Sequence, residues 1–218
     1  MVIQNTSILF LVFLLISGKV FATDWTGFYL GVGAGKDSSD SHFDDTNTVD
    51  PDPDKTDIGL HAGYRYEFTN NMVVGIAADI NPGSGDARRD TFVGPTANSD
   101  LESTLGDGHS LLVSAGYAHD RLLPYLTTGV AVIEESFCAF NPVGAATCGV
   151  GNINSDDRTG WVIGGGLNYA ITDSVILSFE YRYTDFGNQT YPMTGFTSGR
   201  INSKLEVHKA LFYLSWKF

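Results

Sequence analysis

The chain has 218 residues, of which 25 are acidic and 13 are Lys or Arg, so its formal net charge at neutral pH is −12. A surface of this sign repels a phosphate backbone, which excludes nucleic acid as a partner. Beyond the N-terminal segment no apolar run approaches the roughly 20 residues of a membrane-spanning helix. These features argue against a helical membrane protein and leave a β-barrel open.

The N-terminal segment has the features of a secretory signal peptide. Residues 8–16 form an uninterrupted apolar run, and Val20 and Ala22 fit the small-residue pattern that precedes a signal-peptidase cleavage site. The run is shorter than a membrane span, and the stretch before it carries no Lys or Arg. We predict that residues 1–22 are a cleaved signal peptide, with a retained anchor as the alternative, and that residues 23–218 form one outer-membrane barrel domain.

Eight later segments alternate apolar and polar residues over the length of a tilted membrane strand, about 9 to 11 residues. Side chains alternate across a strand, so each segment would turn one face to lipid and the other to an interior. In chain order the segments are residues 25–36, 56–68, 72–81, 108–119, 124–135, 159–170, 175–184 and 205–218. The predicted fold is all-β, an eight-stranded antiparallel up-and-down transmembrane barrel.

The connections between these segments alternate in length. Short links rich in polar and turn-forming residues occur at 69–71, 120–122 and 171–173. Long links occupy residues 37–55, 82–107, 136–158 and 187–204. Bacterial barrels have short periplasmic turns and longer extracellular loops, so we expect three short turns and both termini in the periplasm, and four long loops outside.

The predicted interior of the barrel is charged. Seven polar side chains fall on lumen faces: Arg65, Asp79, Asn168, Glu180, Arg182, Lys209 and Lys217. An eight-stranded barrel has an interior just wide enough for side chains, and opposite charges inside it would pair. We therefore expect a side-chain-filled lumen, with Gly31, Gly33 and Gly164 among the small residues that make room.

Aromatic residues near the strand ends suit the girdles of a membrane barrel at the lipid–water interfaces. Ordinary strand propensity is the alternative explanation. The candidates are Trp25, Tyr66, Tyr117, Trp161, Tyr169 and Tyr183.

The long links carry the remaining candidate sites. Cys138 and Cys148 lie in the third long link, where an oxidising compartment favours a disulfide, with a two-cysteine metal site as the alternative. The first long link is rich in Asp, which indicates a solvated loop; weak calcium binding is the alternative, although Lys55 stands where an EF-hand needs glycine. No nucleophile and base lie in plausible register, so we expect no catalysis, no cofactor and no resident metal.

Several motifs point to one family of proteins. They are residues 25–31, 71–80, 116–118 with 123–125, 159–161 and 179–187, together with the terminal aromatic strand. In these motifs the chain resembles the alphaproteobacterial family of small outer-membrane barrels that includes surface antigens and hemin-binding proteins. The resemblance implies the outer membrane of a Gram-negative bacterium, contact with its lipid and lipopolysaccharide, and insertion by the barrel-assembly machinery through the terminal Phe218. For some members it also suggests hemin binding, for which His42 and His109 are the extracellular candidates.

Taken together, these patterns favour a structural and surface-interaction barrel without catalysis. A barrel that binds hemin or a host surface ligand is the alternative. A narrow porin-like channel is the third hypothesis.

Overall fold

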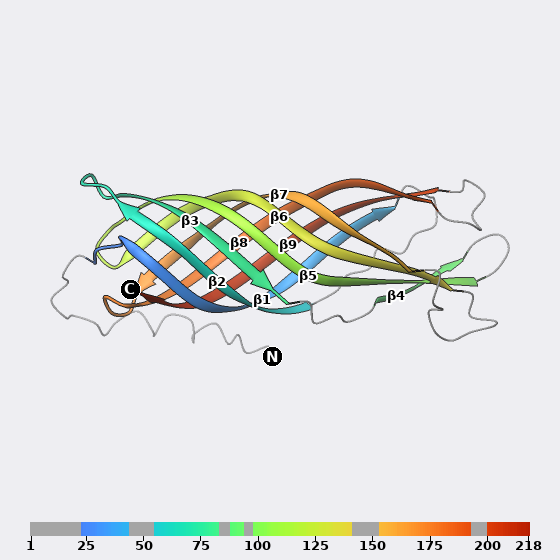
Figure 1. The fold of residues 1–218 in the computed structure, drawn as a ribbon, viewed down its shortest axis with the longest axis horizontal. Coiled ribbons are helices and arrows are strands. Elements are labelled where there is room, and N and C mark those ends of the chain that lie inside the picture. The colour runs from blue at the N-terminus through green and yellow to red at the C-terminus, as the bar shows by residue number, and fades with distance from the viewer. Residues whose placement is uncertain (1–22, 44–54, 83–87, 94–97, 141–152, 193–199) are drawn as a thin grey trace, which may run out of the picture.

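The computed structural model describes residues 23–43, 55–82, 88–93, 98–140, 153–192 and 200–218, and these form one antiparallel sheet that closes on itself (Figure 1). Its strands are β1 (Gly27–Phe43), β2 (Lys55–Glu67), β3 (Met72–Asn81), β4 (Arg88–Val93), β5 (Asn98–Tyr117), β6 (Leu122–Phe140), β7 (Ile153–Ala170), β8 (Val175–Pro192) and β9 (Arg200–Lys217). Within these ranges no helix has the length and apolar character needed to cross a membrane.

Eight of the strands form the barrel wall. The sheet order is β3-β2-β1-β9-β8-β7-β6-β5, and pairing of β3 with β5 closes the circle. The first and last strands meet in a long seam that runs from the pair Tyr29↔Lys217 to the pair Phe43↔Ser203. The predicted eight-stranded antiparallel barrel is thus confirmed.

The structure differs from the predicted loops at the end of the barrel away from the termini. The ladders continue past the expected strand ends, so that β5 begins at Asn98 and β8 reaches Pro192. A ninth strand, β4, pairs with the early part of β5, where the sequence predicts a loop. These extensions are held together by backbone hydrogen bonds, which any residue except proline can make. Strand pairing there does not need the alternation of apolar and polar residues by which a membrane strand is recognised in the sequence.

Three short turns join the strands at the opposite end, as the sequence predicts. They connect β2 to β3, β5 to β6 and β7 to β8, and Figure 1 shows them at the end that also holds the C-terminus. Asn71 and Asp120 adopt left-handed backbone conformations, with φ of 64° and 54°. Asn and Asp tolerate this region better than most residues, which explains why these turns can be so tight.

The outer surface of the barrel is apolar. Large side chains on alternate positions of every barrel strand are exposed, among them Phe28 at 67%, Leu126 at 73% and Phe212 at 55%. Soluble monomers rarely expose apolar patches of more than a few hundred Å². An apolar band of this kind that encircles the molecule matches the lipid-facing surface of a membrane barrel.

Candidate functional site

The inward positions of the strands bring the predicted charged residues into the lumen. Arg65, Asp79, Glu180 and Arg182 are buried there, with at most 6% of their surface exposed. Residues at alternate positions face the same side of a strand, so the period that turns Phe179 and Tyr181 to lipid turns Glu180 and Arg182 inward.

Arg182 is the centre of the lumenal network. Its Nη1 donates to Asp79 Oδ2 across the barrel at 2.5 Å, and its Nε donates to Glu180. One guanidinium thus forms ion pairs with two carboxylates, whose side chains are 0% and 4% exposed. A planar guanidinium has donors on several edges and can serve two acceptors at once, which a lysine ammonium on one flexible stem does less well.

Hydroxyl and imidazole groups extend this network on both sides. Asp79 also hydrogen-bonds to Nδ1 of His61 and accepts from Ser110 Oγ at 2.9 Å, while the hydroxyl of Tyr125 donates to Glu180. The remaining acceptors of both buried carboxylates are thereby used, as a buried charge requires.

A second arginine lies one layer closer to the periplasmic end. The guanidinium of Arg65 stacks 4.0 Å from the ring centroid of Tyr29 and donates to Asn168 Oδ1 at 3.4 Å, which also accepts from Ser178 Oγ at 2.6 Å. The ring of His61 lies against Tyr29 and Tyr213, with centroid distances of 5.1 and 4.5 Å. Every barrel strand contributes at least one residue to this network, in strand order Tyr29, His61, Asp79, Ser110, Tyr125, Asn168, Arg182 and Tyr213.

The side chains of this network leave little free space. A lumenal cavity bordered by His61, Arg65, Tyr125 and Glu180 has a volume of about 20 Å³. That is enough for about one water molecule. Glycines let the rings approach the wall: a Cβ at Gly33 would overlap the ring of Tyr213, and one at Gly166 would lie 2.6 Å from the Tyr125 hydroxyl.

The two lysines predicted for the lumen lie at its ends. Lys209 forms a salt bridge with Asp37 at 2.9 Å on the outer side. Lys217 donates to the carbonyl of Asp24 on the periplasmic side.

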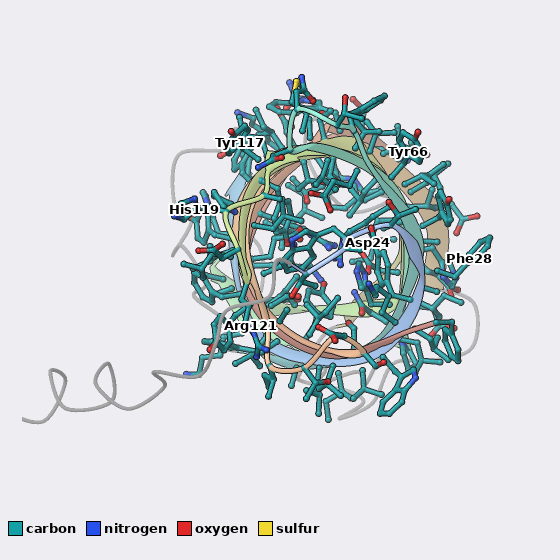
Figure 2. All side chains as sticks on the ribbon, turned by 90° about the vertical axis from the view of Figure 1, so that its left-hand side faces the viewer. Asp24, Phe28, Tyr66, Tyr117, His119 and Arg121 are labelled. Atoms are coloured by element: carbon teal, nitrogen blue, oxygen red, sulfur yellow. The ribbon has the colours of Figure 1, made fainter. Side chains whose placement is uncertain are left out.

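Residues 23–26 close the periplasmic mouth of the barrel. Trp25 is 0% exposed and packs in a cluster with Val73, Ala118, Leu123, Ala170 and Ile176. Its backbone N–H donates to Glu67 Oε2 at 2.9 Å, and Glu67 N–H donates in turn to Thr26 Oγ1 at 3.1 Å. Figure 2, which faces this end, shows Asp24 lying across the opening while Phe28, Tyr66 and Tyr117 point outward.

The prediction that Trp25 belongs to the interfacial girdle is therefore wrong. The chain turns into the lumen before β1 begins at Gly27, so the ring fills the mouth instead of meeting lipid. Tyr66, Tyr117 and Trp161 do face outward, with 48%, 54% and 49% of their surface exposed.

Several network residues were not singled out from the sequence: Tyr29, His61, Ser110, Tyr125 and Tyr213. The signal for His61 was its spacing of four from Arg65, which puts both on one strand face. The aromatic members could equally be lipid-facing residues, as long as it is not known which alternate positions of each strand face the lumen.

The candidate sites of the long links are less fully described. Cys138 lies in β6, but Cys148 lies outside the described residues, so the disulfide stays a prediction. His42 lies in β1 and His109 is exposed on β5. Among the described residues there is no group of three or more His, Cys, Asp or Glu side chains placed to hold a metal ion.

The closed eight-stranded sheet, its apolar exterior and its charged interior define a small outer-membrane β-barrel protein. Residues 8–218 match the family described as outer membrane protein beta-barrel domain, and the chain belongs to that family. Its location is the outer membrane of a Gram-negative bacterium.

Similar proteins come from alphaproteobacteria, as the sequence motifs predict. The 25 kDa outer-membrane immunogenic protein of Brucella abortus is 29% identical over 203 residues, which cover 91% of this chain and 79% of that protein. The 31 kDa outer-membrane immunogenic protein of Brucella melitensis is 28% identical, with coverage of 89% and 84%. Among solved structures, the outer membrane protein OprG from Pseudomonas aeruginosa superposes with a TM-score of 0.51 at 15% identity, covering 90% of this chain and 98% of OprG, and shares the fold.

Proposed function

We propose that the protein is a non-catalytic outer-membrane barrel whose lumen is closed by side chains and whose interactions are made at the cell surface. The observation that supports this proposal is the position of Arg182, which joins Asp79 and Glu180 across the barrel with all three side chains at most 4% exposed. A hydrated ion or solute would have to separate these buried charges, which costs several kcal/mol for each ion left unpaired.

The closed lumen is tested by transport measurements on the refolded protein. Liposomes that contain the protein should not swell in solutions of small sugars or amino acids, and planar bilayers should show no steady channels. A wide porin reconstituted in parallel is the positive control. Steady single-channel currents of comparable size from the wild-type barrel would refute the proposal and favour the porin-like hypothesis.

The surface role is supported by the strands that continue beyond the apolar band and by the relatives. Both Brucella relatives are described as outer-membrane immunogenic proteins. We expect antibodies raised against the refolded barrel to label intact cells that express it. Labelling that requires permeabilised cells would contradict surface exposure.

Binding of a host surface ligand or of hemin is the second candidate function. Its support is that His109 is exposed at the outer part of β5, where an external ligand could reach the imidazole. Titration of the refolded protein with hemin should then give a Soret shift that His109→Ala or His42→Ala weakens. The absence of a Soret shift in the wild-type protein would remove the hemin hypothesis.

A further inference from the structure

The periplasmic half of the lumen holds a buried cation without a carboxylate partner. Arg65 is 6% exposed, and its Nη1 has no hydrogen-bond partner. Within the part of the chain that the structure describes, no carboxylate lies at ion-pair distance from this guanidinium, which contacts Asn168 Oδ1 and the ring of Tyr29. A buried charge has lost its hydration and is costly unless a counter-charge touches it. Arg65 is therefore a cation whose surroundings supply no anion.

The two buried carboxylates nearby belong to the adjacent layer. All four oxygens of Asp79 and Glu180 have hydrogen bonds with groups other than Arg65. Arg182 is shared by both carboxylates, so one positive and two negative charges leave this layer with a net charge of −1 when His61 is neutral. Together with Arg65 the side chains have no net charge, but they divide into an anionic group and a separate cation.

The lumenal cavity lies against both groups. Arg65, His61 and Glu180 border it, and its volume of about 20 Å³ suits one water molecule or a monatomic anion of similar size. Asn168 also borders it, and since its Oδ1 accepts from Arg65 and from Ser178, the amide N–H groups of Asn168 are the donors that it has to offer. The cavity thus combines a guanidinium with neutral donors in a space too small for a polyatomic anion.

His61 is the titratable group that can balance an added anion. Its Nδ1 hydrogen-bonds to Asp79, and because a carboxylate only accepts, Nδ1 carries the proton of the neutral ring and Nε2 is where a second proton adds. An imidazolium at this place would touch a carboxylate. The charged and titratable side chains around the ring and the cavity are Tyr29, Arg65, Asp79, Tyr125, Glu180, Arg182 and Tyr213.

Charge balance requires the anion and the proton to bind together. An anion alone would give these buried side chains a net charge of −1, and a proton alone would give them +1. With both, Arg65 has a counter-ion in contact, while Arg182 and protonated His61 balance the two carboxylates. We propose that the lumen binds one monatomic monovalent anion, of the chloride class, beside Arg65, together with one proton on His61.

Ions in solution reach this site only when the barrel opens locally. At the periplasmic mouth Trp25 packs against Val73 and Leu123, and the latter two also border the cavity. Toward the outer side Arg182 and Leu211 are buried, with 3% and 2% of their surface exposed. The anion therefore enters during folding or exchanges slowly, and a slowly exchanging ion carries no steady current. The proposal rests on the lumenal side chains and not on the surface role of the protein.

Anomalous diffraction from crystals of the protein refolded and grown in sodium bromide would test this proposal. Bromide substitutes for chloride and scatters anomalously, and a pH of about 5 protonates an ordinary histidine. We expect one anomalous peak in the lumen, beside Arg65. The peak should be absent from Arg65→Met and should lose occupancy in His61→Gln. Lys204→Gln, whose side chain is 45% exposed and lies outside the lumen, is the control and should keep the peak.

Urea unfolding of the wild type supplies the affinity and its pH dependence. A ligand that binds only the folded state raises the unfolding midpoint, so sodium chloride should raise it relative to sodium gluconate, whose anion is too large for the cavity. Because one proton binds with each anion, the affinity should fall about tenfold for each pH unit over which free His61 is neutral. The chloride effect should therefore be present at about pH 5 and lost at about pH 8.

Four results would overturn the proposal. Wild-type crystals without a lumenal bromide peak would show that water fills the cavity, and a peak that remains in Arg65→Met would be an adventitious ion only. Equal occupancy at both pH values would separate the anion from His61, and equal urea midpoints in chloride and gluconate would remove the anion from solution. The wild-type comparisons decide the matter if Arg65→Met fails to fold. Channel recordings test the closed lumen separately, so the two proposals can fail independently.

Discussion

Replacement of Arg182 by methionine should destabilise the barrel strongly. The change keeps much of the side-chain length but leaves two carboxylates, with 0% and 4% of their side-chain surface exposed, without their shared cation. Removal of one partner from a buried ion pair costs about 3–5 kcal/mol. Asp79 keeps its contacts with His61 and Ser110, so we expect the lower end, a loss of about 3 kcal/mol in the free energy of unfolding.

The measurement is urea unfolding of the protein in lipid vesicles, followed by tryptophan fluorescence. The control is Lys204→Met, which breaks the salt bridge to Glu206 where the two side chains are 45% and 26% exposed. Exposed pairs contribute about 0–1 kcal/mol, so this variant should unfold near the wild-type urea concentration. If the two variants lose similar stability, the reasoning that Arg182 neutralises buried charge is wrong.

Three further changes probe other parts of the barrel. Trp25→Ala should cost about 3–5 kcal/mol, because a fully buried ring is removed, and it should lower the temperature of the gel-migration shift. Gly33→Ala should cost about 1–3 kcal/mol in the urea assay, because its methyl group overlaps the ring of Tyr213, whereas Gly165→Ala, whose nearest neighbour is Leu126 Cδ2 at 3.3 Å, should be close to neutral. Phe218→Ala should reduce the amount of barrel assembled in the outer membrane of living cells while the purified, refolded variant keeps its gel shift; normal assembly would argue against Phe218 as the assembly signal.

The membrane-spanning part of the fold could be predicted because lipid and lumen impose opposite demands on alternate residues. The apolar row Phe212, Leu214 and Trp216 on β9 is exposed in the structure, and the intervening Tyr213 and Ser215 are buried in the lumen. The turns at Asn71 and Asp120 could be predicted from residue type, since few residue types adopt left-handed backbone angles.

The parts that could not be predicted lie where this alternation stops. Neither β4, with the sequence RRDTFV, nor the extension of β5 to Asn98 shows a sustained alternation of apolar and polar residues, so a periodic signal is missing there. Trp25 is a different case: it shares the odd parity of Gly31 and Gly33, which places it on the lumen side, but its position near a strand end also fits a girdle. The sequence could not show that Arg182 forms an ion pair with Asp79, because the two residues are 103 positions apart.

That separation along the chain has a consequence for assembly. β3 and β8 are not neighbours in the sheet, so Arg182 reaches Asp79 only when the wall has curved round and brought the two strands to face each other. In an open or misregistered sheet the same groups would carry unmatched charge toward the bilayer, which strongly opposes insertion. The ion pair therefore stabilises the closed cylinder and not a partly closed sheet. We expect it to make folding of the barrel more cooperative, with fewer populated intermediates.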